Sequence, residues 1–295
     1  MKLTLLGTGT PAPSLTRQSS GYLVEIGDDT IVLDHGPGAM HRLLEAGRQP
    51  TDVTHLFLTH LHYDHIADYP RLMLQRWDQG AGTVPELQVF GPKPVAEITE
   101  KLFGEDGVYG LDLESRVNHP SSQRIYAARG GTPPRAKPVP DVREITAGDV
   151  VQGEGWRVTA GAARHFQPIL ECLGYRIECD AGTVVYSGDS GGVLQSMIDL
   201  ARDCDVLIHM CHFESATEPD EAFRISCGGH MDVAEVARQA NAKTLVLTHF
   251  PPPLDAPGCL ERLVADIRTV FDGRVIIGRD LLEVPITADH SVVID

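Results

Sequence analysis

The chain has 295 residues, of which 42% are hydrophobic and 22% charged, a composition typical of a globular protein. Its formal net charge of −16 argues against a broad nucleic-acid-binding face, because such a face needs clustered lysine and arginine. No apolar run approaches the ~20 residues of a membrane helix, and the N-terminus lacks a signal-peptide pattern. We therefore expect a cytoplasmic protein that does not contact membranes, whose six cysteines are reduced.

The first third of the chain alternates apolar runs with turns rich in glycine and aspartate, which predicts short strands and two helices. The predicted strands are residues 2–6, 21–26, 30–34 and 55–58, and the predicted helices are residues 39–46 and 69–77. The last of these strands runs directly into a histidine-rich stretch.

The segment from about residue 104 to 149 shows only a weak pattern. It contains Gly130-Gly131 and Pro133-Pro134, which disfavour regular structure. Since long irregular stretches in compact domains are usually functional, we expect an irregular lid over a cleft or a dimer arm.

The second half repeats the alternation of strands and helices. The predicted strands are residues 156–160, 172–178, 183–187, 206–209, 245–248 and 275–277, and the predicted helices are residues 193–202, 232–241 and 260–271. The second of these helices is predicted to begin at Asp232, which has capping-box spacing to Glu235. Two β-rich halves with helices outside predict a four-layer αββα sandwich, formed by a single domain of residues 1–295.

The strongest chemical signal is a cluster of three histidines and one aspartate within six residues: His60, His62, Asp64 and His65. A loop that leaves a buried strand can direct such closely spaced side chains into one cavity. Neutral imidazole and carboxylate suit zinc, and also manganese or iron. A purely structural role is disfavoured, because each group would have to be desolvated and hydrogen-bonded.

Three further ligand-capable residues lie at strand ends downstream. His165 precedes one predicted strand, while Asp189 and His249 each come immediately after a buried strand. Singly, each is more often an ordinary satisfied polar residue. Together with the first cluster they complete two metal sites.

The ordered motifs of the chain resemble those of the metallo-β-lactamase superfamily. Within it they resemble the ribonuclease Z-like branch, which also holds phosphodiesterases and arylsulfatase-like enzymes. The motifs are Leu5-Leu6-Gly7-Thr8-Gly9-Thr10, Leu33-Asp34-His35-Gly36, the HxHxDH cluster, Tyr186-Ser187-Gly188-Asp189, Gly229-His230 and Leu247-Thr248-His249-Phe250. The resemblance covers nearly the whole chain.

By position, the resemblance implies a dinuclear centre of two divalent ions, expected to be zinc. It implies that His60, His62 and His165 hold one metal, that Asp64, His65 and His249 hold the second, and that Asp189 bridges them. Asp64 would also orient the nucleophile, a hydroxide shared by the metals, and His230 would act near the leaving group. Asp34 would steady a ligand histidine.

Two departures from the ribonuclease Z pattern bear on the substrate. Met210 stands where that branch carries a glutamate, and His35 stands where a cysteine is usual. We also see no long tRNA-grasping arm of the family type. The roles of His35, His209 and His212 stay open.

These observations favour a metal-dependent hydrolase of a small phosphodiester or ester-like molecule, acting as a homodimer. Three alternatives are a tRNA 3′-end endonuclease, a lactonase, carboxylesterase or amide-ring hydrolase, and a non-catalytic binding scaffold. The complete ligand set argues against the scaffold.

Overall fold

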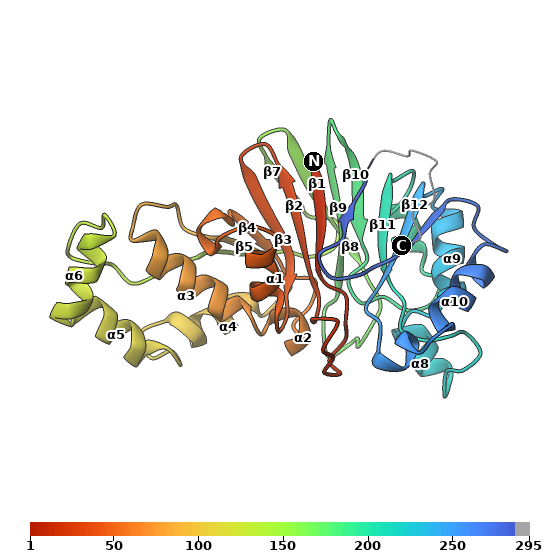
Figure 1. The fold of residues 1–295 in the computed structure, drawn as a ribbon, viewed down its shortest axis with the longest axis horizontal. Coiled ribbons are helices and arrows are strands. Elements are labelled where there is room, and N and C mark those ends of the chain that lie inside the picture. The colour runs from red at the N-terminus through yellow and green to blue at the C-terminus, as the bar shows by residue number, and fades with distance from the viewer. Residues whose placement is uncertain (287–295) are drawn as a thin grey trace.

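Two seven-stranded β-sheets stack face to face, with helices on both outer sides (Figure 1). This architecture is given by a computed structural model, which describes residues 1–286. The first sheet has the strand order β14-β1-β2-β3-β4-β5-β6, and the second has the order β13-β12-β11-β10-β9-β8-β7. The predicted four-layer αββα sandwich is confirmed.

Each sheet combines antiparallel strands with a parallel set. The strands of the first sheet are β1 (Lys2–Gly7), β2 (Gly21–Ile26), β3 (Asp29–His35), β4 (His55–Phe57), β5 (Gln88–Gly91), β6 (Asp141–Glu144) and β14 (Glu283–Val284). Those of the second are β7 (Val150–Gly153), β8 (Trp156–Ala162), β9 (Leu173–Cys179), β10 (Gly182–Tyr186), β11 (Val206–Met210), β12 (Thr244–Thr248) and β13 (Arg274–Ile277). Strands β3 to β6 run parallel, and so do β10 to β13.

Short helices lie outside the two sheets. They are α1 (Ala39–Glu45), α2 (Tyr63–Ile66), α3 (Tyr69–Gly80), α4 (Val95–Phe103), α5 (Gly110–Asn118), α6 (Pro120–Ala128), α7 (Gln195–Leu200), α8 (Glu221–Ser226), α9 (His230–Gln239) and α10 (Cys259–Ile267), with 3₁₀ turns at Pro50–Asp52 and Pro252–Asp255. No helix within residues 1–286 is long and apolar enough to cross a bilayer.

The central strands are apolar on both faces because each sheet is covered on both sides. In β2, Tyr22 belongs to the core between the sheets, while Leu23 packs in the layer under the outer helices. In β12, Val246 faces the same inter-sheet core and Leu247 the helices on the other side. This alternation follows from the two-residue repeat of a strand.

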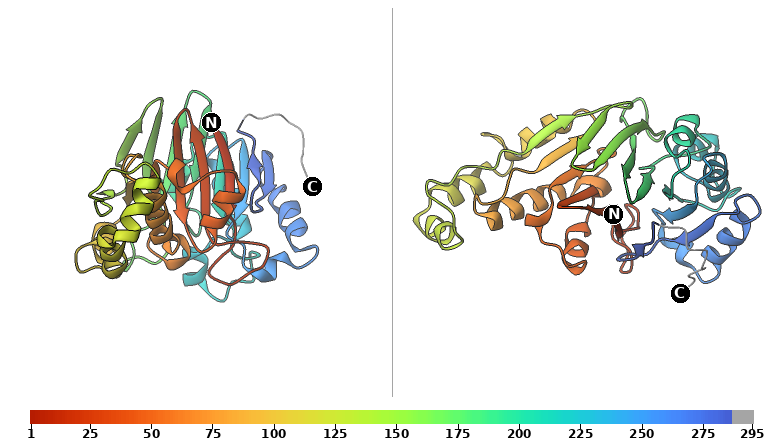
Figure 2. Two further views of the ribbon diagram at one scale, coloured as in Figure 1. Left: turned by 60° about the vertical axis from the view of Figure 1, so that its left-hand side comes forward. Right: turned by 90° about the horizontal axis from the view of Figure 1, so that it is seen from above.

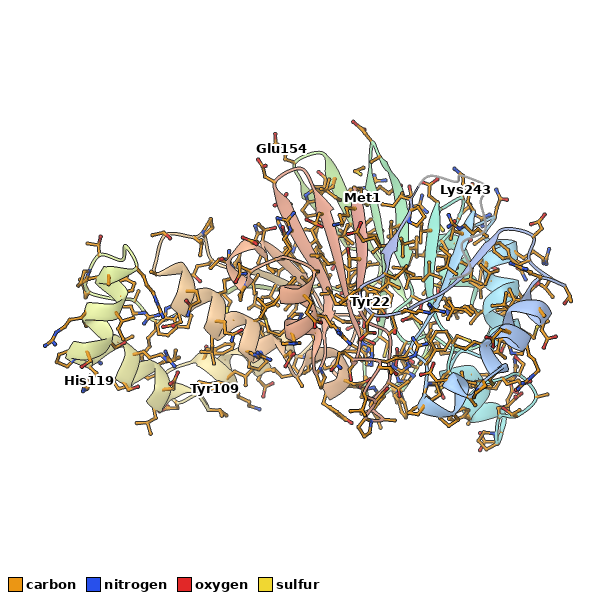
Figure 3. The ribbon with its side chains drawn as sticks, viewed as in Figure 1. Met1, Tyr22, Tyr109, His119, Glu154 and Lys243 are labelled. Carbon is orange, nitrogen blue, oxygen red and sulfur yellow. The ribbon has the colours of Figure 1, made fainter. Side chains whose placement is uncertain are left out.

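The expectation that residues 104–149 are irregular is wrong for about half of the segment. It contains α5, α6 and β6, which pairs with β5, so regular structure is absent mainly between α6 and β6. The two helices extend beyond the sandwich at one end (Figures 1 and 2). Tyr109 and His119 lie at this end, whereas Tyr22 lies in the middle of the molecule (Figure 3).

Asp78, near the end of α3, explains why residues 104–140, here called the arm, are ordered. Its carboxylate binds Arg116 at 3.3 Å, Arg129 at 2.7 Å and Arg135 at 2.9 Å. The Arg135 guanidinium also lies 3.6 Å from the centre of the Trp77 ring. These long-range ion pairs tie the arm to α3, and no local periodicity in the sequence reveals them.

Helix α9 begins two residues earlier than predicted. Gly229 is its N-cap, and His230 is its first residue. Asp232 does not cap the helix, because its carboxylate instead accepts hydrogen bonds from Arg224 at 3.0 and 3.2 Å. His230 is therefore held at the N-terminus of a helix that rests against β11 and α10.

Candidate metal centre

Six of the seven predicted ligands follow a strand of a parallel set, and His165 follows β8, which is antiparallel to both of its neighbours. Asp34 lies near the end of β3, and the histidine cluster follows β4. Asp189 follows β10 and His249 follows β12 directly. Carboxyl ends of parallel strands share one edge of a sheet, so loops far apart in sequence meet there.

The first group consists of four side chains: His60, His62, His165 and Asp189. Each offers one ligand atom, and these atoms lie within 4.8 Å of one another. Nε2 of His60 is 3.0 Å from Nδ1 of His62, and Nε2 of His165 is 3.5 Å from Oδ2 of Asp189. His62 is partly exposed, so this group faces the solvent on one side.

The second group consists of Asp64, His65 and His249, again with ligand atoms within 4.8 Å of one another. Oδ2 of Asp64 is 3.4 Å from Nε2 of both histidines. Asp189 lies between the two groups, because its oxygens are 3.5 Å from His65 and 3.4 Å from His249 as well as 3.5 Å from His165. The structure thus brings together all seven residues.

Hydrogen bonds to Nδ1 of His65 and of His165 fix Nε2 as the nitrogen that faces the centre. Nδ1 of His65 is 2.7 Å from Oδ2 of Asp34, and Nδ1 of His165 is 2.6 Å from the carbonyl oxygen of Ser226. Both partners are acceptors, so Nδ1 donates, and in the neutral ring Nε2 keeps its lone pair toward the centre. Ligand histidines in metal sites are typically held in this way.

The buried carboxylates at the centre are held in their charged form. Burial opposes ionisation of Asp189, but His249 and His65 hold its pKa well below the usual range. Burial also disfavours a charged His65, yet Asp189 and Asp34 raise its pKa well above the ordinary value. The carboxylates are therefore anionic and attract positive charge.

The donor geometry fits divalent cations. Donors about 2.1 Å from a tetrahedral zinc ion lie about 3.4 Å apart, close to the spacings above. Nε2 of His65 and Oδ1 of Asp189 are buried without a hydrogen-bond partner within the described residues. Divalent cations held by these residues would satisfy both atoms, so the residues fit divalent metal binding.

His230 belongs to neither metal group and contacts Ser215 and Asp266 instead. Its Nδ1 accepts a 2.9 Å hydrogen bond from the Ser215 N–H, and its Nε2 lies 3.5 Å from Oδ2 of Asp266. Burial lowers its pKa, while Asp266 and Glu214 act in the opposite direction. Met210, at the position where the family pattern has a glutamate, is buried in β11, whereas Asp266 and Glu214 act on His230. Its catalytic role stays a prediction.

Of two further side chains at the centre, His212 was left without a role by the sequence analysis and Phe166 was not singled out. Nδ1 of His212 lies 3.4 Å from Nδ1 of His249, and Phe166 packs edge-to-face against His62 and His165. His212 carried a usable signal, because it follows the end of β11 in the same way as the ligands follow β10 and β12. His35 and His209 are fully or almost fully buried and belong to neither metal group.

An αββα sandwich with histidines and aspartates collected at its strand ends defines the metallo-hydrolase class of proteins. The profile of the Beta-lactamase superfamily domain matches residues 29–250, and the chain belongs to this superfamily, in its metallo-β-lactamase, ribonuclease Z-like branch. It is a metal-dependent hydrolase.

Relatives named Ribonuclease Z match the chain over almost its entire length. The protein from Mycobacterium bovis (strain BCG / Pasteur 1173P2) is 32% identical over 292 residues, covering 97% of this chain and 98% of the relative. Two solved structures share the fold. YhfI from Bacillus subtilis has a TM-score of 0.72 at 22% identity, covering 96% of this chain and 99% of YhfI. Human tRNase Z, short form, has a TM-score of 0.67 at 20% identity, covering 98% and 100%.

Proposed function

We propose that the protein is a dinuclear hydrolase of small phosphodiesters or similar esters. The observation that carries this proposal is Asp189, whose two oxygens approach ligand nitrogens of both groups within 3.5 Å. A carboxylate in this position suits two cations rather than one. Zinc is the expected metal, because imidazole and carboxylate donors in near-tetrahedral spacing suit it.

Two bound divalent ions would supply Lewis acidity and bring the pKa of a shared water toward neutrality. In the reaction, water adds its oxygen to phosphorus, the bond from phosphorus to the leaving alcohol breaks, and the alcohol departs with a proton. Asp64 is anionic, since neighbouring His249 and His65 overcome the effect of burial and hold its pKa far below its usual range. It can therefore accept a hydrogen bond from the attacking water and orient it.

Two histidines are candidates for the proton donor to the leaving alcohol. We propose His230, whose Nε2 carries the ring proton because Nδ1 accepts the Ser215 N–H. Asp266 and Glu214 favour the protonated ring. His212 is the alternative, because its ring centre lies 5.5 Å from that of His249.

A ribonuclease Z activity on pre-tRNA is the second candidate function. The relatives with that name support it, and so does the composition of the arm. Residues 115–140 contain four arginines and one lysine but no acidic residue, in a chain with a net charge of −16. Three of these arginines bind Asp78, while Arg124 and Lys137 form no ion pair within residues 1–286.

One comparison separates these functions. After metal analysis, kcat/KM is measured at moderate salt on a bis-aryl phosphodiester, an aryl sulfate, a lactone and a pre-tRNA. We expect the diester to be hydrolysed far better than pre-tRNA is processed, because long RNA draws much of its affinity from lysine and arginine contacts. Efficient, position-specific cleavage of pre-tRNA would establish the second candidate instead.

A further inference from the structure

An aromatic side chain stands at the solvent side of the first metal group. Phe166 follows His165 directly and is 49% exposed. Its ring centre lies 4.3 Å from that of His165 and 5.1 Å from that of His62, with interplanar angles of 90° and 74°. Phe166 therefore places an exposed phenyl surface beside two candidate ligands of this group.

The turn that carries Phe166 is well defined. The Ile169 N–H donates a 3.1 Å hydrogen bond to the Phe166 carbonyl oxygen, and the Gln167 side chain bonds the His165 N–H at 2.8 Å and the Ala163 carbonyl oxygen at 2.7 Å. The phenyl ring is thus presented by a fixed backbone. Tyr63, next to His62, is a second exposed aromatic residue, and its hydroxyl donates to the Pro11 carbonyl oxygen at 3.1 Å.

The arginine next to His165 in the chain is already engaged. Arg164 donates to two backbone carbonyl oxygens, at 3.2 and 3.4 Å. These contacts direct its guanidinium to the backbone, so apolar contact with the exposed ring of Phe166 is what this turn offers a substrate.

The position of Phe166 also decides which part of a diester it meets. It lies beside His62 and His165, whereas His212 lies beside His249 on the opposite side of Asp189. With His212 or His230 serving the leaving alcohol, the ester group that stays on phosphorus lies on the side of Phe166.

We propose that Phe166 is a specificity-determining residue, and that the substrate is a small phosphodiester whose retained ester group is a planar, apolar ring packed against it. The inference rests on the proposed hydrolase function. Aromatic rings pack favourably in offset or edge-to-face contacts beyond the gain from burying their area. A ring on the retained group therefore improves binding, and it lowers KM more than it changes kcat.

Two diesters with one leaving group isolate the effect. Bis(4-nitrophenyl) phosphate and methyl 4-nitrophenyl phosphate both release nitrophenolate, but the first retains an aryl group and the second a methyl group. The ratio of their kcat/KM values is measured in each variant. The difference in intrinsic reactivity between the two diesters cancels when the ratios of two variants are compared. In Phe166→Ala we expect this ratio to fall about tenfold, mainly through KM, and in Phe166→Trp we expect it to be retained.

Ile169→Ala is the matched control. It removes an apolar side chain from the same turn, but Ile169 is 87% exposed, so the ratio should stay at the parent value. A binding measurement accompanies the kinetics: calorimetry with diphenyl phosphate should show Kd about tenfold higher for Phe166→Ala at unchanged metal content.

An unchanged ratio and an unchanged Kd in Phe166→Ala would overturn the proposal, as would an equal loss in Ile169→Ala. A metal-loaded parent protein that hydrolyses neither diester would instead contradict the proposed function itself, and this proposal with it. The two failures are thus distinguishable, because only the second concerns the parent protein.

Discussion

Asp34 connects the metal-binding loop to the inter-sheet core. Its carboxylate accepts hydrogen bonds from the Thr59 N–H at 2.7 Å, the Thr59 hydroxyl at 2.8 Å and the Tyr186 hydroxyl at 2.9 Å, and it also binds His65. It is completely buried. One side chain therefore sets both the start of the loop after β4 and the orientation of a ligand ring, which is the role expected from the resemblance.

Replacing Asp34 by asparagine should weaken metal binding while the fold is kept. Asparagine has the same shape and tolerates the left-handed backbone found here (φ 54°), but it removes the charge that holds His65. Loss of such a supporting partner typically costs about 10–100-fold in metal affinity. Competition with a chelator measures this, and Asp28→Asn, in an exposed turn, is the control. Equal affinity in both variants would contradict the role of Asp34.

His62→Ala should remove metal and activity together. The purified parent protein should contain about two divalent ions per chain, since seven candidate ligands lie together and one carboxylate among them could bridge. The variant should contain about one ion or fewer and hydrolyse the diester at a small fraction of the parent rate. Elemental analysis and turnover are the measurements, with His41→Ala, an exposed histidine of α1, as control. A variant with full metal content and full turnover would refute the assignment.

Helices α5 and α6 form the element whose sequence pattern was weakest. The structure records no hydrogen bond or ion pair, within residues 1–286, between these helices and the seven candidate ligands. Both helices extend beyond the sandwich at one end, so of the two roles expected for this segment we propose the subunit contact (Figure 1). Large apolar side chains on the arm are exposed, including Val108 at 78% and Leu111 at 84%.

Asp78→Ala should loosen the arm and leave the metal centre intact. It deprives buried Arg135 of its ion-pair partner, and an unpaired buried group costs about 1–3 kcal/mol or more. Amide exchange of residues 104–140 should accelerate about tenfold or more, with diester hydrolysis unchanged. Asp106→Ala, an exposed position in the same segment, is the control. Equal protection of the arm in both variants would show that Asp78 does not anchor it.

The same ion pairs make the arm sensitive to acid. Burial opposes ionisation of Asp78, but hydrogen bonds from Arg129 and Arg135 lower its pKa overall. Its contribution to stability is therefore complete above the unfolded pKa of about 3.9 and is lost as pH falls through the lower folded pKa. Amide exchange of the arm, corrected for its intrinsic pH dependence, should rise only in that acidic range. A rise near neutral pH would contradict this account.

At the scale of the whole molecule, charge and the exposed arm together predict self-association. The body of the protein is strongly acidic, whereas residues 115–140 carry only basic charges. An arm that packs on a second copy would pair these opposite charges and cover its apolar side chains. Light scattering should give twice the mass of one chain, and Leu111→Asp with Ile125→Asp should give the mass of one chain while diester hydrolysis persists. A monomeric parent protein would exclude the homodimer.

Local patterns in the sequence were sufficient for ten of the fourteen strands in the described part of the chain, for the layers and for the types of candidate ligand, whereas the short strands β5, β6, β7 and β14 were not predicted. Alternating or continuous apolar runs bury whichever faces the neighbouring layers cover, so β2, β3 and β12 could be predicted to within a residue or so. The ligands were recognisable because His, Asp and Gly at strand ends serve no core-packing purpose. These features depend on neighbours in the chain, and a single sequence contains them in full.

Only the tertiary structure decided how distant segments combine. Asp78 orders the arm through ion pairs with arginines up to 57 positions away in the chain. Asp232 binds Arg224 and does not cap the helix as its spacing to Glu235 had suggested. Phe166 and His212 could be assigned to the site only because they contact His62 and His249, which belong to other loops. Such interactions depend on through-space distances between segments that the sandwich brings together. Local sequence patterns do not determine those distances, because the packing of the two sheets sets them.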